Sequence, residues 1–146
     1  MVNTRNVLLW LHIIIALVTI GPFLLFDVLT PGLVRAGNAP VLRTLERMTK
    51  VLGPMTALIA VAGIALVIDS DAYDFSQGWI IGALAGFVAI VAIGIGILGT
   101  SVTRAVERIE AGQDASAEAT RLRIFGTVNI VLILTIVWLM VAKPGL

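Results

Sequence analysis

The residue best suited to chemistry in this chain is its only histidine, His12, which lies inside an uncharged apolar stretch from Val7 to Phe26. An ionisable side chain in such a stretch costs about 2.5 kcal/mol or more in a bilayer unless it finds a partner. As a functional group, His12 is an axial haem ligand, a metal ligand or a proton relay. As a structural group, it is a neutral histidine bonded to a hydroxyl or carbonyl on a neighbouring helix, and Thr135 lies at a suitable depth.

The haem hypothesis needs a second ligand, because one histidine cannot form a bis-histidine site within one chain. Met140, at a similar depth, or His12 of a second copy would supply it, and haem b is the cofactor that this hypothesis implies. The chain has no cysteine, which excludes thiolate metal sites, disulfides and thiol nucleophiles. No Ser/His/Asp arrangement, glycine-rich phosphate loop or pair of intramembrane carboxylates is present, so the sequence predicts no catalytic residue.

Two further polar residues interrupt the apolar stretches. Asp27 follows the first stretch, where it is expected to pair with one of the nearby cations (Arg43, Arg47, Lys50 or Arg123), and a substrate or proton role is the alternative. Asn129 lies inside the last stretch, and the simplest interpretation is a hydrogen bond between helices. His12 and Asp27 fall on roughly the same helix face, which leaves a small-solute or proton pathway between them as a further hypothesis.

Composition identifies the elements that must position these residues. Hydrophobic residues make up 59% of the 146, charged residues only 13%, and the mean hydropathy is +1.06. Soluble domains carry about 25% charged residues. Four apolar runs have a length suited to crossing a bilayer, and their continuity excludes the alternating strands of a barrel. We therefore expect an all-α integral membrane four-helix antiparallel bundle in a single domain, residues 1–146, with helices near 7–29, 41–68, 78–111 and 116–142.

Breaker residues predict the C-terminal end of the first helix, and the distribution of Lys and Arg predicts the orientation of the bundle in the membrane. The breaker residues Thr30, Pro31 and Gly32 predict the end of the first helix. Eight of the ten Lys and Arg residues lie in the first and third connections. The positive-inside rule places those connections in the cytoplasm and both termini outside, so the bundle is predicted to be N-out and C-out. The basic residues suit anionic lipid headgroups better than nucleic acid, and the three tryptophans are typical of an interfacial belt.

The third apolar run carries small residues at a spacing of four. Gly78, Gly82 and Gly86 form a GxxxGxxxG pattern, which places a smooth groove on one helix face and allows close approach of another helix. The groove either packs against the first or last helix of the same chain or serves as a homodimer face.

Several short motifs together resemble a known family. They are Leu8-Leu-Trp10-Leu-His12-Ile, Gly21, Arg35-Ala-Gly, Arg123 with Asn129, and Met140-Val-Ala-Lys143-Pro-Gly. They resemble an uncharacterised bacterial family of predicted four-span integral membrane proteins, a domain of unknown function, over essentially the whole chain. The first-helix pattern is also similar to that of the copper-resistance D proteins and the haem-dependent membrane protoporphyrinogen oxidases. Those resemblances imply copper or haem binding at His12, but the other histidines of these groups are absent here.

These observations favour a small non-enzymatic protein of the bacterial inner membrane. It either self-associates through its glycine-bearing helix or serves as an accessory subunit of a larger membrane complex. The alternatives are a haem- or metal-binding redox protein that uses His12 and the small-solute or proton pathway. A cofactor site requires a cavity beside His12, whereas an accessory role requires His12 to be enclosed and hydrogen-bonded.

Overall fold

A computed structural model describes residues 3–145 of the chain. Its elements are all helical: α1 (Thr4–Arg35), α2 (Ala39–Ile68), α3 (Gly78–Ile93), the π-helical segment η1 (Gly94–Gly99), α4 (Thr100–Glu110) and α5 (Ser116–Ala142). η1 joins α3 to α4, so that one continuous rod runs from Gly78 to Glu110. Within the described residues, four rods are long and apolar enough to cross a membrane. The predicted all-α fold with four membrane-spanning helices is confirmed.

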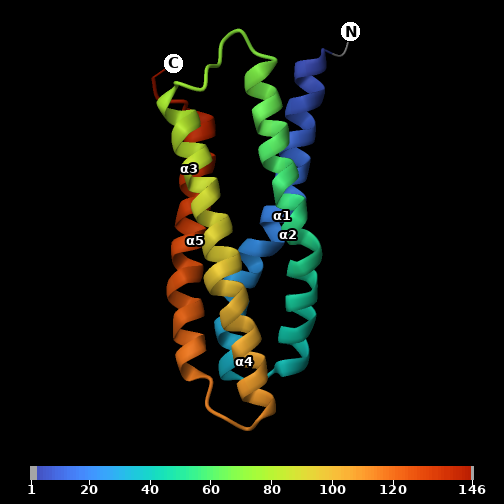
Figure 1. The fold of residues 1–146 in the computed structure, drawn as a ribbon, viewed down its shortest axis with the longest axis vertical. Helices are drawn as coiled ribbons and strands as arrows, with labels where there is room; N and C mark the ends of the chain where they lie inside the picture. The colour runs from blue at the N-terminus through green and yellow to red at the C-terminus, as the bar shows by residue number, and fades with distance from the viewer. Residues whose placement is uncertain (1–2, 146) are drawn as a thin grey trace.

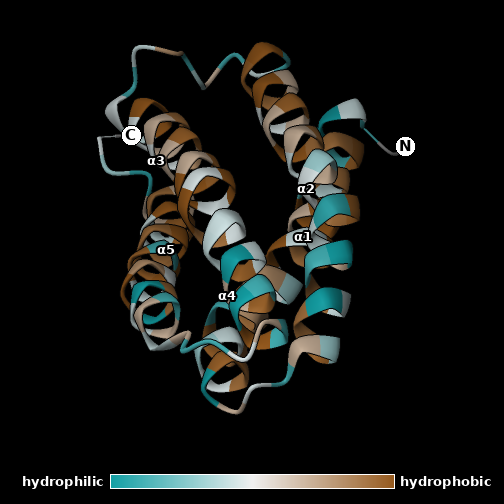
Figure 2. Ribbon diagram, turned by 60° about the horizontal axis from the view of Figure 1, so that its bottom comes forward, coloured by the Kyte–Doolittle hydropathy of each residue, from teal (hydrophilic) through white to brown (hydrophobic). Residues whose placement is uncertain are grey.

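The four rods run antiparallel, and both ends of the chain lie at the same end of the bundle (Figure 1). We call this the terminal end, and we call the opposite end, which carries the α1–α2 and α4–α5 connections, the basic end. Figure 2, with the basic end forward, shows hydrophilic residues on α4 and the start of α2 and hydrophobic residues along the rods. This distribution is the one that a bilayer around the middle of the rods requires.

The helices pack in series rather than in a closed ring. α2 packs on α1, α1 on α5, and α5 on α3. Within residues 3–145, α2 and α3 make few direct contacts, and Figure 1 shows these two helices diverging toward the terminal end. At the basic end α4 packs against both α2 and α5, around a buried core that includes Val34, Leu42, Val106 and Leu122.

Polar contacts reinforce the α2–α4 packing at the basic end. The guanidinium of Arg43 pairs with the Glu110 carboxylate, with 2.6 Å between Arg43 Nε and Glu110 Oε1. Thr103 donates its hydroxyl to Glu46 Oε1 at 2.9 Å. We call this pair of contacts the clasp. It holds α2 against the α3–α4 rod at one end only.

The end of α1 differs from the expectation at Thr30–Gly32, because the helix continues to Arg35. Pro22 and Pro31 both lie inside α1. Two residues after Arg35, Gly37 has φ +65°; the backbone N–H of Asn38 donates to Leu33 O, and that of Gly37 donates to Val34 O. This arrangement is a Schellman motif, which satisfies the last carbonyls of the helix. The prediction was wrong because the left-handed glycine, not the proline, terminates the helix.

The glycine pattern of α3 is used only in part within the chain. A Cβ on Gly82 would lie 3.1 Å from Leu139 Cδ1, and one on Gly86 would lie 2.9 Å from Ile136, so both glycines face α5 closely. A Cβ on Gly78 would meet nothing within 4 Å.

The three tryptophans differ in exposure: Trp10 and Trp138 are about 60% exposed, whereas Trp79 is buried at 8%. Trp79 therefore faces the interior and departs from the expected interfacial belt.

Candidate functional site: a cavity between the helices

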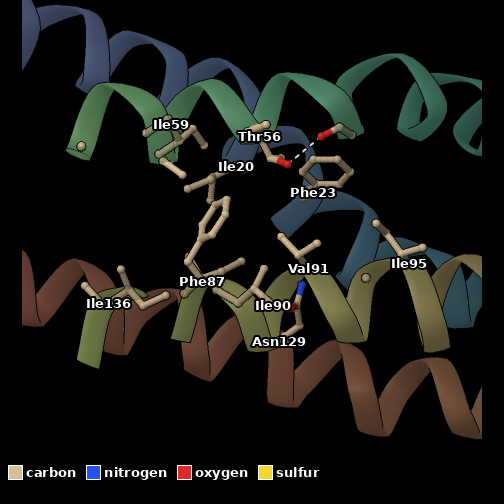
Figure 3. Close-up of a pocket in the computed structure, with 18 of the residues that line it drawn as sticks. Ile20, Phe23, Thr56, Ile59, Phe87, Ile90, Val91, Ile95, Asn129 and Ile136 are labelled. Carbon is tan, nitrogen blue, oxygen red and sulfur yellow. Dashed lines mark hydrogen bonds between the residues drawn. The ribbon is translucent and has the colours of Figure 1, made fainter. Parts of the chain in front are cut away.

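A cavity of about 1240 Å³ lies between α2 and α3, and α1 and α5, which pack on each other, also line it. Its walls are mostly aliphatic and aromatic, and Figure 3 shows Phe87 of α3 projecting across it toward α1 and α2. Charged side chains line its two ends: Arg5 and Lys143 at the terminal end, and Glu46, Lys50, Arg104 and Glu107 at the basic end. The cavity extends along most of the bundle because α2 and α3 do not close against each other.

One face of α1 supplies both of the polar residues singled out in that helix. His12, Ala16, Ile20, Phe23 and Asp27 all line the cavity. Their spacing of three or four residues puts them on a single helix face. The sequence therefore brings His12 and Asp27 to the same cavity.

His12 is fixed by a contact with α2. Its Nδ1 lies 3.0 Å from the backbone oxygen of Ile59. A carbonyl oxygen only accepts hydrogen bonds, so this contact places a proton on Nδ1 and, in the neutral ring, leaves the lone pair on Nε2. His12 is 9% exposed, and a Cβ on Gly63 would lie 3.1 Å from its Cε1. Gly63 thus provides the space that the imidazole occupies against α2.

The expected partner of His12, Thr135, is not its partner. The Thr135 hydroxyl donates to Val131 O within α5 at 2.8 Å and is exposed. Depth alone suggested this pair, but the His12 side of α1 packs on α2, and Thr135 faces away from the cavity in a shallow groove with Trp138. Met140 does line the same cavity as His12. Within the described residues, no group of three or more His, Asp or Glu side chains is placed to hold a metal ion.

Asp27 and Asn129 meet across the α1–α5 interface. Asn129 Nδ2 donates to Asp27 Oδ2 at 2.7 Å. Asn129 is only 4% exposed, and its Oδ1 has no hydrogen-bond partner among the described residues. A Cβ on Gly126 would lie 3.0 Å from the Asp27 backbone oxygen, so this glycine allows α5 to approach α1. Both polar side chains line the cavity, and Figure 3 shows Asn129 pointing from α5 toward it.

The expected ion pair of Asp27 is absent from the described residues. Arg43 pairs instead with Glu110, and Lys50 with Glu46 at 3.1 Å. Asp27 lies eight residues before the end of α1, about 12 Å by helical rise. Arg43 and Lys50 therefore pair with carboxylates that lie at the basic end itself. Arg47 and Arg123 make no ion pair with Asp27 either.

The terminal end of the cavity carries a cluster that the sequence did not predict. The rings of Tyr73 and Trp79 meet edge to face at 5.4 Å, and the Tyr73 ring lies 5.3 Å from the Arg5 guanidinium and 4.8 Å from Lys143 Nζ. Lys143 also donates to the Tyr73 hydroxyl, and this hydrogen bond lowers the pKa of Tyr73 below its ordinary value of 10.0. The cluster joins α1, the α2–α3 connection, α3 and the C-terminal turn, segments whose proximity no local pattern reveals.

Four long apolar helices and a cavity that holds isolated polar groups define a multi-span α-helical integral membrane protein. The chain belongs to the family described as Predicted integral membrane protein (DUF2269), whose model matches residues 6–144. Comparison with curated proteins and with solved structures finds no match.

Proposed function

We propose that this chain is a small non-enzymatic membrane protein that binds an apolar ligand in the cavity between its helices. The observation that supports this proposal is the cavity itself, about 1240 Å³ with mostly apolar walls and a few polar groups. Ligand sites are typically concave, largely apolar and furnished with a small number of polar groups that fix orientation. The gap between α2 and α3 offers a route from the bilayer. By the positive-inside rule, the basic end faces the cytoplasm of a bacterial cell and the terminal end faces outward.

Photolabelling tests this binding directly. The protein in lipid nanodiscs is irradiated with a neutral alkane that carries a diazirine, and the labelled residues are mapped by mass spectrometry. We expect labelling at Phe87 and Ile90, which line the cavity, above that at Val88, which is 66% exposed on the same helix. Ala60→Trp narrows the cavity and lowers the labelling, whereas Val61→Trp, on the exposed side of α2, leaves it unchanged. Preferential labelling of Val88, or equal labelling in both tryptophan variants, contradicts the proposal.

Haem b is the second candidate ligand, and one observation favours it. The Nδ1–H of His12 is directed to a backbone carbonyl, which leaves the lone pair of the neutral ring on Nε2, and His12 is among the residues that line the cavity. This is the arrangement by which metal-binding histidines are commonly oriented. His12 would hold the iron, with Met140 as the further candidate ligand from α5. Bound haem would supply one-electron redox chemistry.

The visible absorption spectrum of protein purified from haem-replete cells tests this candidate. We expect a Soret band that shifts on reduction with dithionite, is lost in His12→Ala and persists in Thr135→Ala, whose exposed hydroxyl lies away from the cavity. A colourless protein, with both variants equally well folded, excludes haem as the ligand.

Self-association and an accessory role are supported less directly. Gly82 and Gly86 face α5 of the same chain, so a homodimer would have to use another surface. A continuous polar pathway is also less favoured. Thr19, midway between His12 and Asp27, is fully buried and donates its hydroxyl to Ile15 O at 2.7 Å within α1.

A further inference from the structure

The polar atoms in the middle of the cavity present hydrogen-bond acceptors. They are the carboxylate of Asp27 and, about 22 Å away along α1 by helical rise, Nε2 of His12, whose ring donates through Nδ1. The nearby hydroxyl of Thr56 donates to Gly53 O at 2.6 Å and is thereby occupied. A buried acceptor without a donor costs about 1–3 kcal/mol. The site therefore favours a ligand that supplies hydrogen-bond donors.

The negative charge of Asp27 inside the cavity also favours a ligand that donates hydrogen bonds, and in particular a cation. Asp27 is the acidic side chain that lines its middle part, and among residues 3–145 no Lys or Arg forms an ion pair with it. The lining cations lie at the two ends, where Lys50 bonds Glu46, and Arg5 and Lys143 lie against Tyr73. A carboxylate surrounded by apolar walls stabilises a positive charge more strongly than it would in water.

Aromatic faces surround the same region. Phe23 and Phe26 of α1 line the cavity with their ring centroids 6.2 Å apart at right angles, and Phe87 projects into the cavity from α3 on the side of Ile20 (Figure 3). Aromatic rings attract a cation within about 6 Å of their faces, and the attraction is larger where water is excluded. Phe23 lies one helical turn before Asp27 on the same helix face, so a cation beside the carboxylate is close to the Phe23 ring.

We propose that the ligand of this cavity is a protonated amine with an apolar body, its ammonium group held by the carboxylate of Asp27, which Asn129 orients. This inference rests on the proposed function, since it specifies the chemical class of the ligand that the cavity binds. The N–H groups of the ammonium donate to the Asp27 carboxylate, one oxygen of which already accepts from Asn129 Nδ2. The apolar body fills the aliphatic part of the cavity toward His12 and reaches it from the bilayer between α2 and α3.

Competition against the neutral photoprobe tests the proposal. Dodecylammonium and dodecanol, which differ in the head group, are added to nanodiscs of zwitterionic lipid, and cavity labelling at Phe87 and Ile90 is measured at equal content of each competitor in the bilayer. We expect dodecylammonium to displace the probe at about a tenfold lower content than dodecanol, the advantage of one charge pair in a partly desolvated site. Asp27→Asn removes this advantage, whereas Asp71→Asn, in the exposed α2–α3 connection and outside the cavity lining, preserves it.

The outcomes separate this inference from the function on which it rests. Cavity labelling with equal displacement by the two competitors overturns the amine and leaves apolar ligand binding intact. Absence of cavity labelling overturns the proposed function itself. The comparison of the two competitors in the unaltered protein needs no variant, so it remains decisive if Asp27→Asn fails to fold. A preference for the amine that survives in well-folded Asp27→Asn overturns the assignment to Asp27.

Discussion

Tyr73 is the only tyrosine of the chain, and it meets two cations at the terminal end of the cavity. Lys143 donates to its hydroxyl and lowers the pKa of the phenol below 10.0, with a smaller contribution from Arg5. Because the nearby positive charges favour the phenolate, Tyr73 should ionise at lower pH than a free tyrosine.

The ultraviolet absorbance of tyrosinate, followed during an alkaline titration, measures this shift without interference from other tyrosines. We expect Lys143→Met to move the midpoint upward toward the ordinary value. Arg123→Met, at the basic end, should leave it unchanged. A midpoint that does not respond to Lys143→Met would show that the hydrogen bond to Lys143 is not formed in the membrane.

At the level of single residues, sequence reasoning identified His12, Asp27 and Asn129 but assigned partners to only some of them. The interhelical hydrogen bond of Asn129 follows from placing an amide in an apolar helix, and the structure supplies Asp27 as its partner. The pairing of His12 with Thr135 was predicted only from the similar depth of the two residues in the bilayer. Depth is given by helical rise, whereas the neighbour is decided by which helix packs on which face, and this is not a local property of the sequence.

At the scale of the helices, glycines determine where α1 approaches its neighbours. Gly63 of α2 lies against His12, and Gly126 of α5 lies against the backbone of Asp27. His12 and Asp27 of α1 therefore each lie against a glycine of a neighbouring helix. The GxxxGxxxG pattern of α3 is the more obvious signal in the sequence, but only two of its three glycines make a close contact within the chain.

Gly126→Ala should destabilise the bundle. The added Cβ would lie 3.0 Å from a backbone oxygen, which cannot rotate away as a side chain can. Overpacking of this kind costs about 1–3 kcal/mol, and the shift should weaken the Asn129–Asp27 hydrogen bond. Thermal unfolding in detergent, followed by circular dichroism, measures the change.

Gly32→Ala in α1 provides the matched control. Its added Cβ meets nothing within 4 Å, so only the helix preference for alanine remains, worth about 0.5–1 kcal/mol in favour of the folded state. Equal stability of the two variants would argue against close α1–α5 contact at Gly126.

The helix count and the apolar runs could be predicted from sequence because each depends on length and hydropathy within one segment. The end of α1 could not be predicted from breaker residues alone. Proline is tolerated inside a membrane helix when the surrounding structure satisfies the backbone carbonyl that loses its N–H donor. Pro31 therefore lies inside α1 and does not end the helix. The cavity depends on the angle between α2 and α3, which no single helix encodes.

For the whole molecule, the absence of cysteine permits a clean test of sidedness. Asp71 lies in the α2–α3 connection at the terminal end, and Gln113 lies in the α4–α5 connection at the basic end, both exposed. By the positive-inside rule, a membrane-impermeant maleimide added to intact spheroplasts should label Asp71→Cys and not Gln113→Cys. Inverted vesicles should give the reverse, and labelling of both cysteines from one side would contradict the proposed topology.

The clasp has a mechanical consequence. A helix of the length of α2, 30 residues, is about 45 Å long, so a tilt of about 5° at the fastened end moves the far end by about 4 Å. Because α2 also packs on α1, a tilt of these two helices together about the contacts Arg43–Glu110 and Thr103–Glu46 would widen the space beside α3 most at the terminal end. We therefore expect the width of the opening between α2 and α3 to respond to bilayer thickness and lateral pressure more at the terminal end than at the clasp.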